Sequence, residues 1–164
     1  MAAVVVAACP EAASLDIKIL ATDVDPKIVA QAKRGSYPKD QLSTVPTQYK
    51  TLLAGPTPQP GDTLSINAKL REIISFAELN LIGDWPMRRN FDVIFCRNVA
   101  IYFDPQTQQN LWLRFHDLLT PGGHLMIGHS ERISGPAKTK LHNVDVTTYQ
   151  KPARSTPVLE LEKE

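Results

Sequence analysis

The sequence FDVIFC at residues 91–96 is the strongest strand signal in the chain. Its near-continuous apolar run is typical of a parallel strand that is buried on both faces of a sheet. Pro105 then predicts the start of a helix with an apolar face that runs to about Leu118. A second strand is expected at residues 124–127, after the turn sequence TPGG at 120–123. This order of strand, helix and strand predicts two neighbouring parallel strands.

A similar strand and helix precede residues 91–127 in the chain. The sequence IKILAT at residues 17–22 predicts a strand, and the apolar spacing after it predicts a helix over Pro26–Arg34. Asp25 suits the N-cap of this helix, with Pro26 at its first position. Gly35 suits its C-terminal end. The two units together predict an α/β protein with a doubly wound sheet.

The remaining segments carry weaker signals. Residues 36–63 hold several prolines and no long period, so we expect a loop-rich insertion with a hinge-like turn at 56–61. We also expect a buried strand at Val4–Ala8, a hairpin within 64–74, a strand at 73–76 and a last antiparallel strand at 147–151. The expected organisation is one domain over 1–152, containing the insertion at 36–64, and a polar tail over 153–164.

The composition is that of an ordinary single globular domain. The chain has 164 residues, 43% hydrophobic and 21% charged, and a formal net charge of +1. This balance argues against a strongly basic nucleic-acid surface. No segment reaches the ~18 apolar residues of a membrane helix. Two cysteines and no basic region ahead of Val4 predict a cytoplasmic protein without a disulfide framework or export signal.

Polar residues follow the predicted strands at their carboxyl ends, where sheets of this class bind ligands. They are Asp23, Asn80, Arg97 with Asn98, and the group His129, Ser130 and Glu131. Asp23 is placed to accept hydrogen bonds from ribose hydroxyls, or it supports the turn. Since Asp25 already supplies the helix cap, we expect Asp23 to have no local structural task. Arg97 and Asn98 either line a ligand site or close the end of the sheet.

Several other chemistries are disfavoured by the sequence. The four histidines have no metal-binding spacing on a helix, so we expect no metal site. Ser14 and Ser130 lack the context of a nucleophile elbow. Neither a Walker motif nor the glycine pattern of a dinucleotide-binding dehydrogenase is present. Tyr102, on its spacing alone, is expected to be a core aromatic residue.

Four stretches of the sequence resemble the CheR family, the chemotaxis receptor methyltransferases. They are ATDVDP at 21–26, FAELNL at 76–81, FDVIFCRNVAIYF at 91–103, and LTPGG at 119–123 with GHSE at 128–131. The resemblance covers roughly residues 15–152 in matching order. It implies a class I, Rossmann-like sheet that uses S-adenosylmethionine to methylate receptor glutamates. The inserted segment corresponds to a small antiparallel subdomain that helps the enteric members to dock on the receptor.

The resemblance also implies roles for individual residues. Asp23 would contact the ribose of the cofactor, and Tyr102 would lie beside the transferred methyl group. The other residues implied in the cofactor site are Asn80, Leu81, Cys96, Arg97 and Asn98. The implied partners are the cytoplasmic domains of methyl-accepting chemotaxis receptors, with neither nucleic acid nor membrane insertion involved. A glutamate carboxylate is already ionised at pH 7, so this reaction needs no general base.

The sequence departs from the family pattern in two places. The family has a helical domain before the sheet, and this chain carries no counterpart. The family also has a glycine-containing acidic loop after its first strand, whereas here PEAAS follows Cys9 and no glycine precedes Gly35. Glu11 is the one residue that could replace an acidic contact of that loop. The alternative to an active methyltransferase is therefore a truncated, non-catalytic relative that retains the fold or receptor docking.

Overall fold

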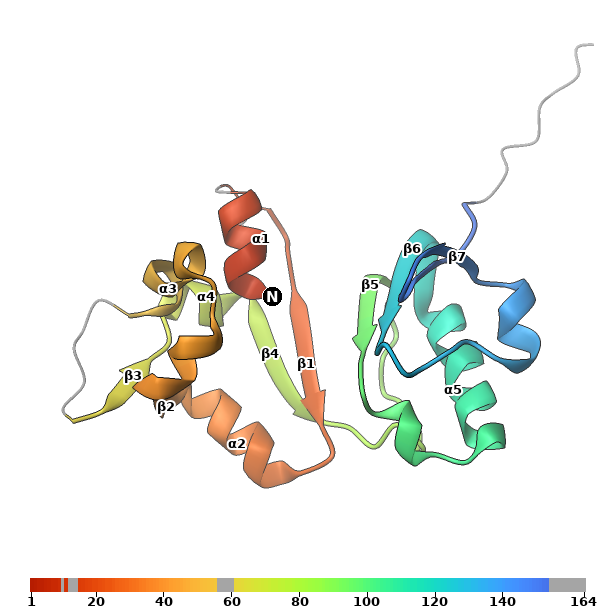
Figure 1. The fold of residues 1–164 in the computed structure, drawn as a ribbon, viewed down its shortest axis with the longest axis horizontal. Coiled ribbons are helices and arrows are strands. Elements are labelled where there is room, and N and C mark those ends of the chain that lie inside the picture. Colours follow the sequence, from red (N-terminus) through yellow and green to blue (C-terminus); the bar gives the residue numbers. More distant parts are fainter. Residues whose placement is uncertain (10, 12–14, 56–60, 154–164) are drawn as a thin grey trace, which may run out of the picture. The chain divides into compact units, whose positions relative to one another are not determined.

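The computed structural model describes residues 1–9, 11, 15–55 and 61–153 (Figure 1). The chain divides into two compact units, Met1–Gly83 and Asp84–Glu164, and each is described by itself. The helices are α1 (Ala2–Ala8), α2 (Pro26–Arg34), α3 (Thr47–Leu53), α4 (Ala68–Glu72) and α5 (Pro105–Leu118), with 3₁₀-helices η2 (Lys39–Thr44), η3 (Ala100–Tyr102) and η4 (Gly135–Thr139). The strands are β1 (Ile19–Asp23), β2 (Ser36–Pro38), β3 (Thr63–Ser65), β4 (Ile74–Glu78), β5 (Phe91–Cys96), β6 (Leu119–Ile127), β7 (His142–Asp145) and β8 (Thr148–Gln150).

The N-terminal unit contains the predicted strand and helix at the expected places. Strand β1 pairs in parallel with β4, from Ile19 opposite Ile74 to Asp23 opposite Glu78. Helix α2 contacts both strands, and its termini follow local rules. The Asp25 side chain accepts a hydrogen bond from the backbone N–H of Lys27, and Gly35 ends the helix at φ 64°.

The expectation of a buried strand at Val4–Ala8 is wrong, because this segment is part of helix α1. Ala2 and Ala3 are buried with Leu70 and Ile73, and Val6 packs against the same cluster. Positions 2, 3 and 6 share one face of a helix, which alternation along a strand could not produce. The packing of α1 against α3 and α4 therefore decides its conformation.

The segment between α2 and β4 is more regular than the sequence suggested. Strands β2 and β3 pair in antiparallel register, with Ser36 opposite Ser65, and η2 and α3 lie between them. The expected hairpin within 64–74 is wrong, because α4 begins at Ala68 with its N-terminus capped by Asn67. Of the expected hinge at 56–61, only Gly61 lies within the described residues.

The C-terminal unit is a four-stranded sheet in the order β5-β6-β8-β7, with α5 packed against it (Figure 1). Strands β5 and β6 are parallel, as predicted, and β8 is the expected antiparallel strand. Strand β6 begins at Leu119 and so includes the segment 120–123, which was expected to be a turn. Strand β7 was not predicted.

Strand β5 is not buried on both faces, contrary to expectation. Ile94 and Cys96 are paired with Leu125 and Ile127, both fully buried, on the face covered by α5. Val93 and Phe95 alternate with them and are 44% and 47% exposed. The apolar run of β5 therefore reflects one packed face and one face that no described element of this unit covers.

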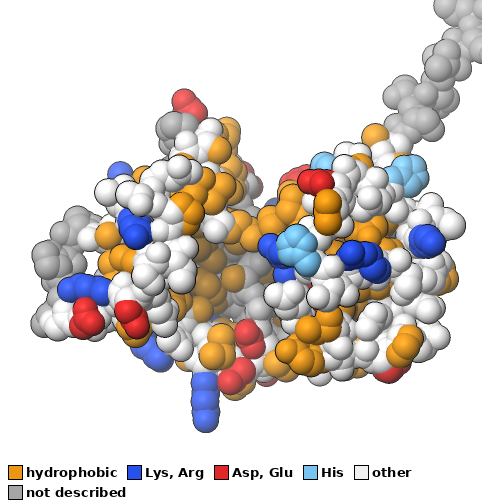
Figure 2. Space-filling view, viewed as in Figure 1, with side chains coloured by type: hydrophobic (Ala, Val, Ile, Leu, Met, Phe, Trp, Pro, Cys, Tyr) orange, Lys and Arg blue, Asp and Glu red, His pale blue; other side chains and the backbone are white. Residues whose placement is uncertain are grey.

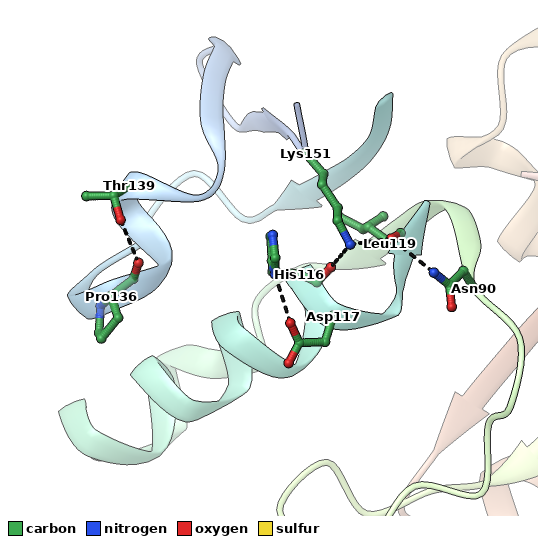
Figure 3. Close-up of polar contacts among 7 residues, drawn as sticks. All are labelled: Asn90, His116, Asp117, Leu119, Pro136, Thr139 and Lys151. Carbon is green, nitrogen blue, oxygen red and sulfur yellow. Dashed lines mark hydrogen bonds and ion pairs between the residues drawn. The ribbon is translucent and has the colours of Figure 1, made fainter. Parts of the chain in front are cut away.

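The end of the described chain is fixed to the C-terminus of α5 (Figure 3). The Lys151 ammonium donates hydrogen bonds to the backbone carbonyls of His116 and Leu119, at 3.0 and 2.8 Å. A cation at this position adds a donor to both carbonyls and opposes the negative end of the α5 dipole. Among the described residues, none of the helices combines the length and apolar character needed to span a bilayer.

Candidate functional site

The candidate residues of the N-terminal unit lie at the carboxyl edge of the β1–β4 pair. Asp23 is the last residue of β1, and its carbonyl accepts a hydrogen bond from the backbone N–H of Leu79, at 2.9 Å. Asn80 follows one residue later, two residues beyond the end of β4. The parallel register therefore brings Asp23 and Asn80 to the same edge of the sheet.

The Asp23 side chain has a local structural task, so the expectation that it has none is wrong. Its Oδ1 atom accepts a hydrogen bond from the backbone N–H of Asp25, at 2.9 Å. This bond shapes the turn into α2, while Asp25 caps the helix through Lys27. The Asp23 Oδ2 atom has no partner among the described residues, so one carboxylate oxygen remains open to a ligand.

Asn80 makes a comparable turn after β4. Its Oδ1 atom accepts a hydrogen bond from the backbone N–H of Ile82, at 2.9 Å. The side chain is exposed, and neighbouring Leu81 is half-buried. The edge of this unit thus presents a carboxylate oxygen, an amide and an apolar side chain, which suits a ligand with both polar and apolar parts.

The candidate residues of the C-terminal unit lie at the carboxyl end of β5. Cys96 is the last residue of the strand and is buried. Burial, and then the nearby negative charge of Glu131, raise the pKa of the Cys96 thiol to about 12. The thiol is therefore neutral at pH 7, and Cys96 serves as a small apolar packing residue rather than a nucleophile.

The loop after β5 is held by a carboxylate from another segment of this unit. Glu131 is buried, with 4% exposure, and its Oε1 atom accepts from the backbone N–H groups of Val99 and Ala100, at 3.1 and 2.8 Å. Its Oε2 atom accepts from those of Asn98 and Gly128, at 3.2 and 2.5 Å. Glu131 therefore fastens the loop after β5 to the turn after β6.

The hydrogen bonds of Glu131 to these two loops, called the Glu131 clamp below, depend on two backbone features. Asn98 has a φ of 58°, in the left-handed region that asparagine tolerates better than most residues. Gly128 lies so close that an added Cβ would stand 2.8 Å from Glu131 Oε2 and 3.0 Å from the Asn98 nitrogen. The glycine and asparagine at these positions thus follow from the approach of the two loops.

The clamped loop leaves its other side chains in solvent. Arg97 and Asn98 are exposed, and Tyr102 is 80% exposed, so the expectation of a core aromatic residue is wrong. Ala100, by contrast, is fully buried and anchors η3. The backbone of the loop is thus fixed while Arg97 and Tyr102 remain available for contacts outside the unit.

Glu131 is the functional residue whose role the sequence did not reveal. Its position after a strand marked it as a polar residue at the sheet edge, but three of its four partners lie 31–33 residues earlier in the chain. Among the described residues, no group of three or more His, Cys, Asp or Glu side chains is arranged to hold a metal ion.

The described strands and helices form an α/β fold with parallel strand pairs. The crystal structure of the N-methyltransferase NodS from Bradyrhizobium japonicum, with S-adenosyl-L-homocysteine, matches with a TM-score of 0.50 at 15% identity. The match covers 82% of this chain and 67% of NodS, and it concerns the fold alone.

The chain belongs to the CheR methyltransferase family: the model of its SAM binding domain matches residues 1–150. The chain is 46% identical over 151 residues to a "Probable chemotaxis protein methyltransferase" of Rhizobium etli, covering 92% of this chain and 56% of that protein. It is 36% identical over 136 residues to the "Chemotaxis protein methyltransferase" of Borreliella burgdorferi, covering 82% of this chain and 47% of that protein. The chain thus spans about half the length of the curated relatives it matches.

The residues present fit S-adenosylmethionine, the cofactor of this family. An open carboxylate oxygen on Asp23 suits ribose hydroxyls. The neutral, buried Cys96 thiol adds no nucleophile at the end of β5.

Proposed function

We propose that this chain is the cofactor-binding part of a protein-glutamate O-methyltransferase that acts on chemotaxis receptors in the cytoplasm. The observation that carries the proposal is the loop after β5, fixed by three hydrogen bonds to Glu131 while Tyr102 stays exposed. A rigid backbone that presents one free aromatic side chain suits an enzyme whose catalysis is mainly positioning.

The proposed roles are divided between the carboxyl edge of the β1–β4 pair and the loop after β5. Asp23 holds the ribose through its open oxygen, and Asn80 with Leu81 borders the adenosine part. Cys96, Arg97 and Asn98 form the cofactor side of the loop after β5, and Tyr102 lies beside the methyl group. Under this proposal Tyr102 is the catalytic residue, because it touches the reacting atoms.

The proposed reaction requires little acid–base catalysis by the protein. The cofactor supplies a methyl group activated by its sulfonium charge. The accepting glutamate has a reference pKa near 4.3 and is ionised at pH 7, so no base has to remove a proton. What the chain's own residues must do is hold the acceptor in line and exclude water.

The alternative is a relative that keeps the fold without methyl transfer. The PEAAS sequence after Cys9 favours this alternative, because it lacks the glycine of the acidic loop that the family uses. Glu11 is the one acidic candidate of this segment, and it is exposed. The two functions differ in a single measurable property, which is transfer of label to receptor glutamates.

Two experiments test the proposal. Titration calorimetry with S-adenosylhomocysteine should give saturable binding, and Asp23→Asn should weaken it about tenfold, the effect of one hydrogen bond to a charged group. Asparagine can still accept from the Asp25 N–H, so the turn is kept. Asp25→Asn, a matched carboxylate-to-amide change, should bind as the parent does.

Methyl transfer is then measured with radiolabelled S-adenosylmethionine and receptor cytoplasmic fragments. Base-labile label on the receptor supports the methyltransferase. Cofactor binding and receptor pull-down without transfer would establish the non-catalytic alternative. A folded chain that fails to bind S-adenosylhomocysteine at millimolar concentration would refute the cofactor site altogether.

A further inference from the structure

The C-terminal unit holds a pocket that the proposed methyl transfer does not use. Its volume is about 580 Å³, and small organic ligands typically occupy sites of about 300–1,000 Å³. The residues that line it are Arg132, Ile133, Lys138, Leu141, His142, Asn143 and Tyr149. None of the residues proposed above for the cofactor or the methyl group is among them, so a ligand here would contact a different set of side chains.

The inner wall of this pocket is apolar. Ile133, Leu141 and Tyr149 belong to the buried core of the unit, and Tyr149 lies on β8, between β6 and β7 in the sheet. A ligand with an apolar body would gain free energy by covering their remaining exposed surface, because that apolar area is then removed from water. Tyr149 adds an aromatic ring, against which an aromatic body stacks favourably.

The rim of the pocket carries basic side chains from three separate segments. Arg132 follows the turn after β6, Lys138 lies in η4, and His142 is the first residue of β7. All three side chains are exposed, and no carboxylate is among the lining residues. In Figure 2 several Lys, Arg and His side chains occupy the visible face of this unit. The rim therefore attracts anions.

The positive charges of the rim are not neutralised by the described residues. Arg132 Nη1 donates hydrogen bonds to the backbone carbonyls of His129 and Glu131, at 2.7 and 2.6 Å. Both acceptors are uncharged, so the guanidinium keeps its charge in a fixed position. Neither Arg132 nor Lys138 forms an ion pair with any described residue. An anionic ligand would supply the missing counter-charge, and the fixed guanidinium lowers the entropy that is lost on binding.

We propose that this pocket binds a small organic anion that carries two negative groups on an aromatic body. The aromatic body covers Ile133, Leu141 and Tyr149, and the negative groups lie against Arg132 and Lys138 at the rim. Neither part suffices alone, because an uncharged ligand leaves the cations without a counter-charge and a simple anion leaves the apolar wall uncovered. The proposal concerns binding only and does not rest on methyl transfer.

NMR titration of the full chain with naphthalene disulfonate tests the site and its ligand class together. We expect saturable shifts at the backbone amides of Ile133, Leu141 and Tyr149, with half-saturation below millimolar ligand. Sulfate, which carries only the charge, and naphthol, which carries only the aromatic body, should each bind at least about tenfold more weakly. Equal binding of sulfate or naphthol, no saturation at millimolar disulfonate, or saturation without shifts at these three amides would overturn the proposal.

Two exposed lysines provide a matched pair of variants for the same titration. Lys138→Glu should weaken binding of the disulfonate about tenfold, because it replaces an attraction at the rim by a repulsion. Lys140→Glu makes the same change of net charge outside the lining residues and should stay within about twofold of the parent at physiological salt. An equal loss in both variants would mean that the net charge of the unit, rather than the pocket, attracts the ligand, and would refute the site.

Discussion

Replacing Glu131 by glutamine should release the loop after β5. The carboxylate accepts two backbone N–H groups on each oxygen, those of Val99 and Ala100 on Oε1 and those of Asn98 and Gly128 on Oε2. A glutamine side chain has one oxygen and one NH₂ group. In either orientation, one buried and one partly buried N–H donor would then face another donor.

The free-energy cost of Glu131→Gln follows from the number of N–H donors that lose their acceptor. A buried donor left without an acceptor costs about 1–3 kcal/mol, and a partly buried one costs less because water reaches it, so the pair costs about 2–4 kcal/mol. Because the total stability of a domain is about 5–15 kcal/mol, we expect local opening of the loop before global unfolding. At about 4 kcal/mol, the amide protection of Val99 and Ala100 should fall about a thousandfold.

Hydrogen exchange measured by mass spectrometry on peptides covering 97–103 provides the assay. Glu131→Gln should exchange there much faster than the parent, while peptides of β1 and α2 should not change. Glu72→Gln, the same substitution at an exposed position, is the matched control. Unchanged exchange in a folded Glu131→Gln protein would refute the clamp. The affinity for S-adenosylhomocysteine should fall in parallel with the lost protection.

Three further outcomes follow from the same geometry. Gly128→Ala places a Cβ 2.8 Å from Glu131 Oε2 and should lower stability by about 1–3 kcal/mol in chemical denaturation, whereas Gly83→Ala, whose nearest contact would be at 3.7 Å, should be neutral. Folding raises the pKa of the Cys96 thiol from 9.0 to about 12. The contribution of the neutral thiol to the free energy of unfolding is therefore complete below pH 9 and is lost between pH 9 and 12, by about 1.4 kcal/mol per pH unit. Denaturation midpoints should show this slope in the parent protein and lose it in Cys96→Ala. Tyr102→Ala should change the free energy of unfolding by less than about 0.5 kcal/mol, because the side chain is 80% exposed, and it should lower the rate of methyl transfer. If stability and the rate of methyl transfer fell together, Tyr102 would have a structural role.

Local chemistry was sufficient to predict some elements. Helix α2 has the predicted bounds because its start and end depend on adjacent residues, Asp25 with Pro26 and then Gly35. Helix α5 likewise begins at Pro105, with Asp104 accepting from the N–H groups of Gln106 and Thr107. Capping energies of about 1 kcal/mol act over three or four residues and are visible in sequence.

Other elements depend on partners distant in the chain. Helix α1 is a helix because Ala2 and Ala3 pack against Leu70 and Ile73, about seventy residues later. The apolar run of β5 carried no sign that only the Ile94 and Cys96 face would be covered within its unit. Tyr102 was expected in the core because spacing alone does not reveal that Ala100 takes the buried position instead.

The clamp also limits how the proposed site can bind its acceptor. Asn98 in the left-handed region and Val99 in the right-handed region point successive N–H groups to one side, a geometry that attracts an anion. Glu131 occupies that position permanently, so these N–H groups cannot bind the glutamate carboxylate of a receptor. Under the proposed function, the acceptor must instead be held by side chains. If the backbone were the binding group, a soluble carboxylate such as glutarate would compete with Glu131 and raise hydrogen exchange at 97–103; we expect no such effect.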